Sequence, residues 1–175
     1  AGGGGDLSDI AITNNFIHGM AAPHGDFSQS YGVLADSKSG GAAGTLSGLT
    51  ITGNEISDLG DGTASSGVGL SLHEVTGAAA GDGVTVGGNA FADIASVPAG
   101  GYLASGIGVG LHGSGDVAPS WGSPSSGAAI GGNTYDNVDV GVFAYGTATE
   151  VDEDASSFTD ALIYVLDVGT NATVE

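Results

Sequence analysis

The chain of 175 residues contains no cysteine and only one basic side chain, Lys38, against 20 aspartates and glutamates. Without cysteine there is neither a disulfide framework nor a thiolate metal site. The formal net charge of -19 excludes nucleic acid and anionic membranes as partners, because a polyanion is bound through cations. Mutual repulsion of so many carboxylates indicates surroundings rich in counterions, either a halophilic habitat or an exterior that contains Ca²⁺.

Long apolar runs and conditions for helix formation are also missing. No segment approaches the roughly 18 apolar residues of a membrane span, so no span is expected. The 35 glycines argue against a helical bundle, because each interior glycine costs a helix about 1 kcal/mol relative to alanine. The 41% of hydrophobic residues lie in short β-branched runs, which favours one folded domain over residues 1–175 rather than disorder. Whether these residues belong to a longer chain stays open.

One strand–turn–strand pattern occurs four times, which is typical of a solenoid. Each copy has an alternating apolar strand, two small or polar residues, an asparagine, and an apolar residue two positions later. The copies begin near residues 10, 49, 84 and 128. A second short strand follows each copy and begins with a glycine; these are Gly32, Gly67, Gly106 and Gly141. Because the spacing varies while the pattern is retained, insertions are expected only in the turns.

The recurring asparagines are expected to form a stacked column at a bend of the chain. Strands stacked about 4.8 Å apart bring equivalent side chains together, and each amide can then bond the amide above and below. We expect each asparagine to adopt a left-handed backbone there. The column comprises Asn15, Asn54, Asn89 and Asn133.

The unit Ile-x-Ile-x-x-Asn-x-Ile followed by Gly-Val or Gly-Ile resembles the right-handed parallel β-helix repeat family over residues 9–146. That family includes pectate lyases, polygalacturonases, phage tailspikes and many surface proteins. The resemblance implies an all-β, right-handed parallel β-helix of about four to five coils. Residues 150–175 include the apolar run 161–166, expected either as a last strand over the open end or as a strand that pairs with the next molecule.

The charged residues favour a protein that is not an enzyme. Lyases of this fold resemble one another in using a basic residue, and this chain has no arginine. Glycoside hydrolysis is the enzymatic alternative, because it needs only two suitably spaced carboxyl groups. Asp58 and Asp93 each follow a repeat asparagine by four residues, so we expect them on adjacent coils about 5 Å apart. Asp136 is one position out of that register.

Metal and modification sites are suggested by shorter patterns. Hard oxygen ligands beside glycines favour Ca²⁺, at Asp58, Asp61, Asp152 and Asp154. His73 and His112 share an offset from their strand glycines, as does Lys38, and the two imidazoles with Glu74 form an alternative transition-metal site. Asn171 begins an N-glycosylation pattern.

The leading hypothesis is an extracellular or cell-surface structural protein. Repetition, open ends and an acidic composition favour self-association into a homopolymeric filament, or assembly with other surface proteins into a layer. The rival is a β-helix that binds or hydrolyses polysaccharide through Asp58 and Asp93. A third class, ice binding, requires regular threonine rows, and Thr13, Thr52 and Thr85 are not expected to share one register.

Overall fold

The computed structural model describes residues 6–21, 28–36, 45–97, 105–112, 124–147, 149–168 and 173–175. Within these residues the protein is all-β, and every pair of neighbouring strands is parallel. The all-β character and the parallel strands of the predicted fold class are thereby confirmed. No described residue lies in a helix, so none of the described segments is a helix able to cross a membrane.

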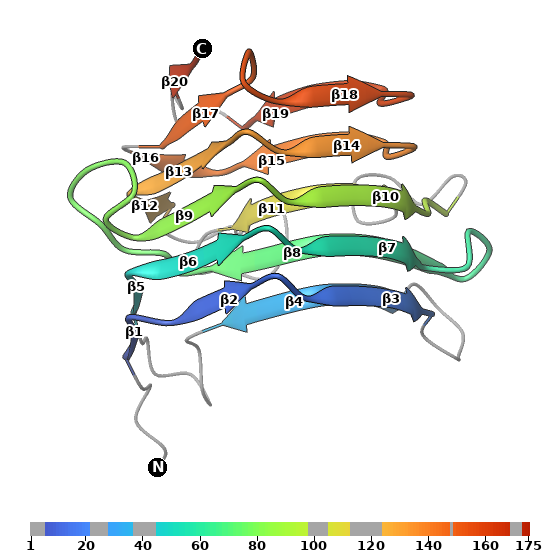
Figure 1. The fold of residues 1–175 in the computed structure, drawn as a ribbon, viewed down its shortest axis with the longest axis horizontal. Coiled ribbons are helices and arrows are strands. Elements are labelled where there is room, and N and C mark those ends of the chain that lie inside the picture. The colour runs from blue at the N-terminus through green and yellow to red at the C-terminus, as the bar shows by residue number, and fades with distance from the viewer. Residues whose placement is uncertain are drawn as a thin grey trace.

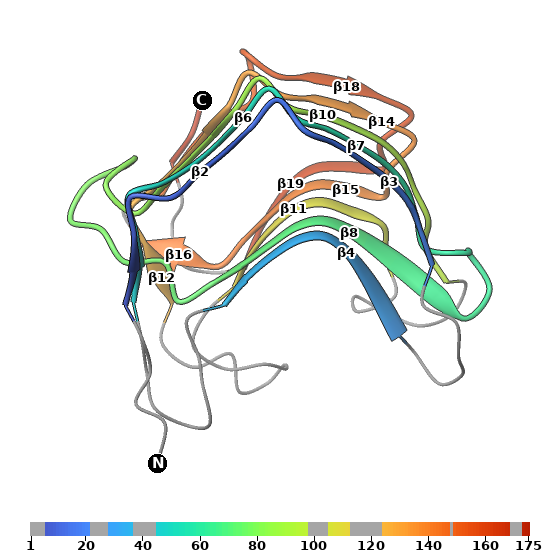
Figure 2. The same ribbon diagram turned by 60° about the horizontal axis from the view of Figure 1, so that its bottom comes forward.

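The strands lie mainly in three sheets. Sheet 1 has the order β2-β6-β9-β13-β17-β20, sheet 2 the order β18-β14-β10-β7-β3, and sheet 3 the order β19-β15-β11-β8-β4. The chain visits the three sheets in the same order five times, and we call the three strands of each passage a rung. Figure 1 shows the rungs stacked in chain order, and Figure 2 shows the sheets as three sides around a common interior.

The strand bounds follow this plan. The first rung is β2 (Ala11–Thr13), β3 (Phe16–Met20) and β4 (Ser28–Asp36), and the second is β6 (Leu49–Thr52), β7 (Glu55–Leu59) and β8 (Ser65–His73). The third is β9 (Val84–Gly87), β10 (Ala90–Ile94) and β11 (Ile107–His112), and the fourth is β13 (Ala128–Gly131), β14 (Thr134–Asp136) and β15 (Val140–Ala144). The fifth is β17 (Glu150–Asp152), β18 (Ser157–Thr159) and β19 (Ile163–Asp167), followed by β20 (Thr173–Val174). Short pairs flank them: β1 (Leu7–Ser8) with β5 (Leu46–Ser47), and β12 (Ser125–Ser126) with β16 (Gly146–Thr147).

Alternation along the strands builds the apolar interior. In β6 the residues alternate between buried and half-buried, and the same holds for β13. Because the strands pair in parallel register, each inward apolar side chain lies directly above an equivalent apolar side chain of the next rung. Sheet 1, for example, carries one inward column: Ile12, Ile51, Val86, Ile130, Val151 and Val174.

A column of glycines in sheet 3 makes room for large side chains from sheet 2. The pairing aligns Gly32, Gly69, Gly108 and Gly141, so the glycine register expected from the sequence was wrong by two residues in the second and third rungs. A Cβ on Gly69 would lie 2.6 Å from a Phe91 ring carbon, and one on Gly108 would lie 2.6 Å from the Tyr135 ring. Neither glycine has a positive φ, so backbone conformation does not require glycine there. The lack of space for a Cβ does.

The inward column of sheet 2 contains the side chains that fill this room. It runs Ile17, Ile56, Phe91, Tyr135 and Phe158. The rings of Phe91 and Tyr135 stack with centroids 5.2 Å apart, and those of Tyr135 and Phe158 with centroids 4.9 Å apart. The Tyr135 hydroxyl is buried near the Asn133 side chain but makes no hydrogen bond of normal geometry, and burial raises the pKa of this hydroxyl.

Residues 150–167 form the fifth rung. Of the two possibilities for the segment after residue 150, the structure shows pairing within the chain: β19 pairs with β15, and β20 pairs with β17. Sheet 1 thus has one strand more than sheets 2 and 3 at this end.

Candidate functional site

Four asparagines tie the rungs together at the corner between sheets 1 and 2. The side-chain nitrogens of the first three donate to the Oδ1 of the next asparagine: Asn15 to Asn54 at 2.9 Å, Asn54 to Asn89 at 2.9 Å, and Asn89 to Asn133 at 3.0 Å. Each of the three accepting oxygens also receives the backbone N–H of the preceding asparagine. The column is a structural element, because its hydrogen bonds are satisfied inside the protein.

The backbone at this corner differs from the expectation. The left-handed residue is the one before each asparagine, Asn14 (φ 55°), Gly53 (67°), Gly88 (64°) or Gly132 (64°), and not the asparagine itself. The turn is made one position earlier, which leaves each amide free to point along the stack. The recurring glycine in the pattern was the available signal.

A second left-handed column lies at the other end of the sheet 2 strands. It contains Gly19, Asp58, Asp93, Asn137 and Asp160, with φ between 52° and 70°. Asp58 and Asp93 occupy adjacent rungs in register, and Asn137 donates from Nδ2 to Asp93 Oδ1 at 2.8 Å. Asp and Asn tolerate this backbone better than other non-glycine residues, which accounts for the residue type. Asn137 and Asp160 were not predicted as members of this column, although both directly follow a sheet 2 strand, β14 and β18.

The four aspartates considered for Ca²⁺ lie apart. Asp58 and Asp61 are beside the second rung, whereas Asp152 and Asp154 are beside the fifth. The described residues contain no group of three or more His, Asp or Glu side chains placed to hold a metal ion. Glycosylation at Asn171 lies outside the described residues.

Two of these aspartates fix turns. Asp61 Oδ1 accepts backbone hydrogen bonds from Thr63, Ala64 and Ser65, and these bonds hold the pKa of the Asp61 carboxyl well below its usual range. Asp152 Oδ1 accepts the backbone N–H of Ala155 at 2.9 Å. Asp58 and Asp154 are exposed.

The two histidines of sheet 3 stack on each other. His73 and His112 are paired in register, with ring centroids 4.6 Å apart. Burial, and then the neighbouring His73, lowers the pKa of His112 to about 3. Asp36 occupies the position in the first rung that was expected for Lys38, so that alignment was wrong, and Lys38 itself lies outside the described residues.

The His112 ring lies beside a second apolar cluster on sheet 3. The cluster consists of Val68, Ile107, Val140 and Phe143, and the His112 ring lies 5.4 Å from that of Phe143. The Ser71 hydroxyl lies 3.0 Å from His73 Nε2. Apolar surroundings disfavour a charged ring at His112.

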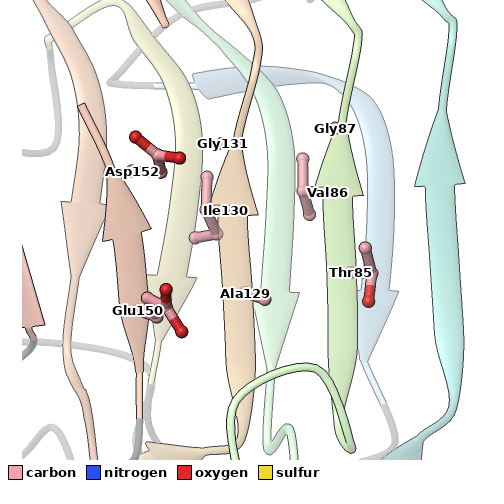
Figure 3. Close-up of a pocket in the computed structure, with 8 residues that line it drawn as sticks. All are labelled: Thr85, Val86, Gly87, Ala129, Ile130, Gly131, Glu150 and Asp152. Carbon is pink, nitrogen blue, oxygen red and sulfur yellow. The ribbon is translucent and has the colours of Figure 1, made fainter. Parts of the chain in front are cut away.

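An open depression of about 240 Å³ crosses the outer face of sheet 1 (Figure 3). Its floor is formed by small residues, Ala129 and Gly131 among them. Glu150 and Asp152 border it on β17 and Thr85 on β9. No aromatic side chain lines it, so it lacks a ring on which a sugar would stack.

The threonines of this face share more order than the sequence suggested. Thr13 is in register with Thr52, and Thr85 with Thr50. Both rows end at the next rungs, where the equivalent residues are Gly87 and Ala129. Each row is thus only two threonines long, too short for the repeated array that an ice-binding face requires.

The exposed apolar side chains gather at the two ends. Among the described residues, the large exposed hydrophobics are confined to the first rung with β1 and to the fifth rung with β20: Leu7, Phe16, Leu34, Leu162, Ile163, Tyr164 and Val174. Inward residues of the first rung, such as Ile12 and Ile17, are only partly buried, whereas their second-rung partners Ile51 and Ile56 are fully buried. The end rungs are thus the candidate site, and they are suited to binding more strands.

Comparison with known proteins supplies no relative from which a function could be taken: no protein-family model, curated protein or solved structure gives a significant match.

Proposed function

We propose that the chain is a right-handed parallel β-helix of five rungs that serves as an extracellular structural protein, joining end to end with other copies into a filament or surface layer. The observation that carries the proposal is that, among the described residues, the large exposed apolar side chains lie in the end rungs and in β1 and β20 beside them. Contiguous exposed apolar surface marks an interaction site in a soluble protein. Among the described residues, β3 and β18, the outermost strands of sheet 2, each pair with one neighbouring strand only, and the outermost strand of a sheet is a template for further pairing.

A second copy is the partner that fits both ends. The apolar columns continue through all rungs, so the last rung of one molecule and the first of another present like residues at like positions. In sheet 3, for instance, the column that starts at Val33 ends at Val165. Contacts of this head-to-tail kind do not close on themselves and therefore generate open filaments.

Charge makes the proposed assembly dependent on cations. Acidic side chains lie at both ends, with Asp9 and Asp36 in or beside the first rung and Asp160 and Asp167 in or beside the fifth. Joining two such ends at low ionic strength brings like charges together. At about 1 M salt the screening length falls to about 3 Å, and bound Ca²⁺ would act at lower concentration.

Sedimentation velocity over a salt series tests the proposal. Wild-type protein is expected to be monomeric at about 0.05 M NaCl and to form large species above about 1 M, or with millimolar Ca²⁺ that a chelator reverses. The matched variants are Leu162→Ser, at an end, and Thr85→Ser, on a middle rung. Loss of assembly with the first and not with the second supports the proposal, and monomers under every condition would refute it.

Carbohydrate binding or hydrolysis is the second candidate, because Asp58 and Asp93 lie in register on neighbouring rungs. The double variant Asp58→Asn/Asp93→Asn keeps residues that tolerate a left-handed backbone. If it abolishes binding or cleavage of a polysaccharide by the wild type while leaving assembly unchanged, this candidate replaces the first.

A further inference from the structure

In sheet 3, the glycine column stops one rung before the end. The pairing of Val140 with Ile163 and of Val142 with Val165 places Tyr164 beside Gly141. The first four rungs thus have glycine at this position and the fifth has tyrosine. A bulky side chain is permitted only where no further rung needs the space.

Each glycine of this column leaves room for a sheet 2 side chain of the next rung, and Tyr164 occupies the equivalent room beyond the fifth rung. A Cβ at Gly32 would lie 2.6 Å from Ile56, and the corresponding pairs are Gly69 with Phe91 and Gly108 with Tyr135. In each case the glycine of one rung faces the sheet 2 side chain of the following rung. By the same rule, the fifth-rung residue Tyr164 faces the place of a sixth-rung side chain.

The Tyr164 ring fills that place. It stacks on Phe158 with centroids 4.5 Å apart and an interplanar angle of 13°. The Tyr135 ring stacks on Phe158 at 4.9 Å and 8°, and two parallel rings cannot share one face. Tyr164 therefore covers the opposite face, on the side where the stack would continue.

Strand β20 covers the same end at sheet 1. Two of its backbone bonds run to β17 and the residue before it: Thr173 N–H donates to Thr149 O at 2.9 Å, and Glu175 N–H donates to Val151 O at 3.0 Å. In return, the Glu175 carbonyl accepts the N–H groups of Glu153 and Asp154 at 2.6 and 3.1 Å. Both residues of β20 are exposed, and Tyr164 is 47% exposed.

We propose that Tyr164 and β20 form a displaceable cap, and that the first rung of a second copy displaces it so that Ile17 of that copy covers Phe158. This inference rests on the proposed end-to-end assembly and adds the contact and its regulation. The N-terminal end carries no equivalent ring within the described residues, so the two ends differ in this respect.

The test compares full-length variants for assembly and for exposure of Phe158. Tyr164→Gly restores the residue of the other rungs, Tyr164→Phe keeps the stacked ring, and Leu162→Gly removes a neighbouring exposed apolar side chain. In high salt, Tyr164→Gly is expected to lower the concentration needed for assembly about three- to tenfold, the equivalent of one aromatic pair. Tyr164→Phe is expected to match the wild type, and Leu162→Gly to raise that concentration.

A second readout applies to the monomer in low salt. Tyr164→Gly is expected to increase the fluorescence of a bound apolar dye, because Phe158 becomes accessible, whereas Leu162→Gly is not. Thr173→Pro, which removes one β20 donor, is expected to add to the effect on assembly.

The possible outcomes separate the claims. Unchanged dye binding in Tyr164→Gly would refute the cap. Increased dye binding with assembly no easier than in the wild type would refute displacement. If neither the wild type nor Tyr164→Gly assembles at any salt concentration, the end-to-end function and the displacement are both refuted, and Tyr164 only stabilises the fifth rung.

Discussion

The middle rungs and the end rungs have nearly the same backbone but opposite surroundings. Asn89, in the third rung, is buried and bonded on both sides, whereas Asn15, in the first, is exposed and bonded on one. Gly108 has no room for a Cβ, whereas its fifth-rung counterpart is Tyr164. In a stack, a residue's role therefore depends on whether another rung lies beyond it, because each rung is stabilised mainly by its neighbours.

The largest expected difference is at the asparagine column. Asn89→Ala removes the acceptor for the Asn54 backbone and side-chain N–H groups and the donor to Ile51 O and Asn133 Oδ1. We expect the free energy of unfolding in urea to fall by about 3–5 kcal/mol, since buried groups lose their partners. Asn15→Ala is the matched control, with an expected loss of about 1 kcal/mol or less. Equal losses would contradict the comparison.

The half-buried His112 gives the third rung an acid-sensitive stability. The folded-state pKa of His112 is about 3, below the unfolded value of about 6.5. The part of the free energy of unfolding that depends on neutral His112 is therefore fully present above about pH 6.5 and is lost as the pH falls toward 3. Between pH 7.5 and pH 5 this amounts to about 2 kcal/mol.

The variant His112→Phe isolates this contribution, because carboxylate titration affects both proteins. We expect the wild type to lose about 2 kcal/mol more than His112→Phe over that pH interval, measured by urea unfolding at each pH. Parallel pH dependences would show that His112 is not buried in its neutral form.

The glycine column provides the next test. Gly108→Ala places a methyl group against the Tyr135 ring, and overpacking of this kind costs about 1–3 kcal/mol. Gly87→Ala, on the outer face of sheet 1, meets only the Gly131 carbonyl at 3.2 Å and should cost less than about 1 kcal/mol. Thermal unfolding followed by circular dichroism measures both, and the opposite ranking would contradict the steric role of the column.

The sequence pattern predicts the apolar and asparagine columns but not the register of the glycine column or the turn role of the aspartates. The inward Ile and Val residues and the asparagine positions follow from the repeat, and the structure joins the same asparagines by hydrogen bonds. The glycine register was misplaced because both Gly67 and Gly69 precede an apolar residue in β8, and only the packing against Phe91 distinguishes them. The left-handed aspartates were recognised as aligned but not as turn residues, since backbone dihedrals are not visible in a pattern of residue types.

A stabilising change is expected inside the aromatic stack. Tyr135→Phe removes a buried hydroxyl that makes no hydrogen bond of normal geometry, and we expect a gain of about 1 kcal/mol in the free energy of unfolding. A loss instead would show that the hydroxyl is bonded in solution. Phe91→Tyr is the converse variant and is expected to destabilise.

The smallest effect on stability is expected at the fifth rung. Leu162 is 79% exposed, so Leu162→Ser should change the free energy of unfolding by less than about 0.5 kcal/mol. Its effect should appear only in assembly, as reduced sedimentation at high salt. A large loss of stability would place Leu162 in the core and weaken its assignment to an interface.

The most direct test of end-to-end stacking is fibre diffraction, with electron microscopy, on protein incubated in concentrated salt. The proposal predicts filaments one molecule wide with a meridional reflection near 4.8 Å, because the parallel strands continue across every junction at the ordinary strand spacing. Dispersed particles in every salt and Ca²⁺ condition, or filaments without that meridional spacing, would contradict it.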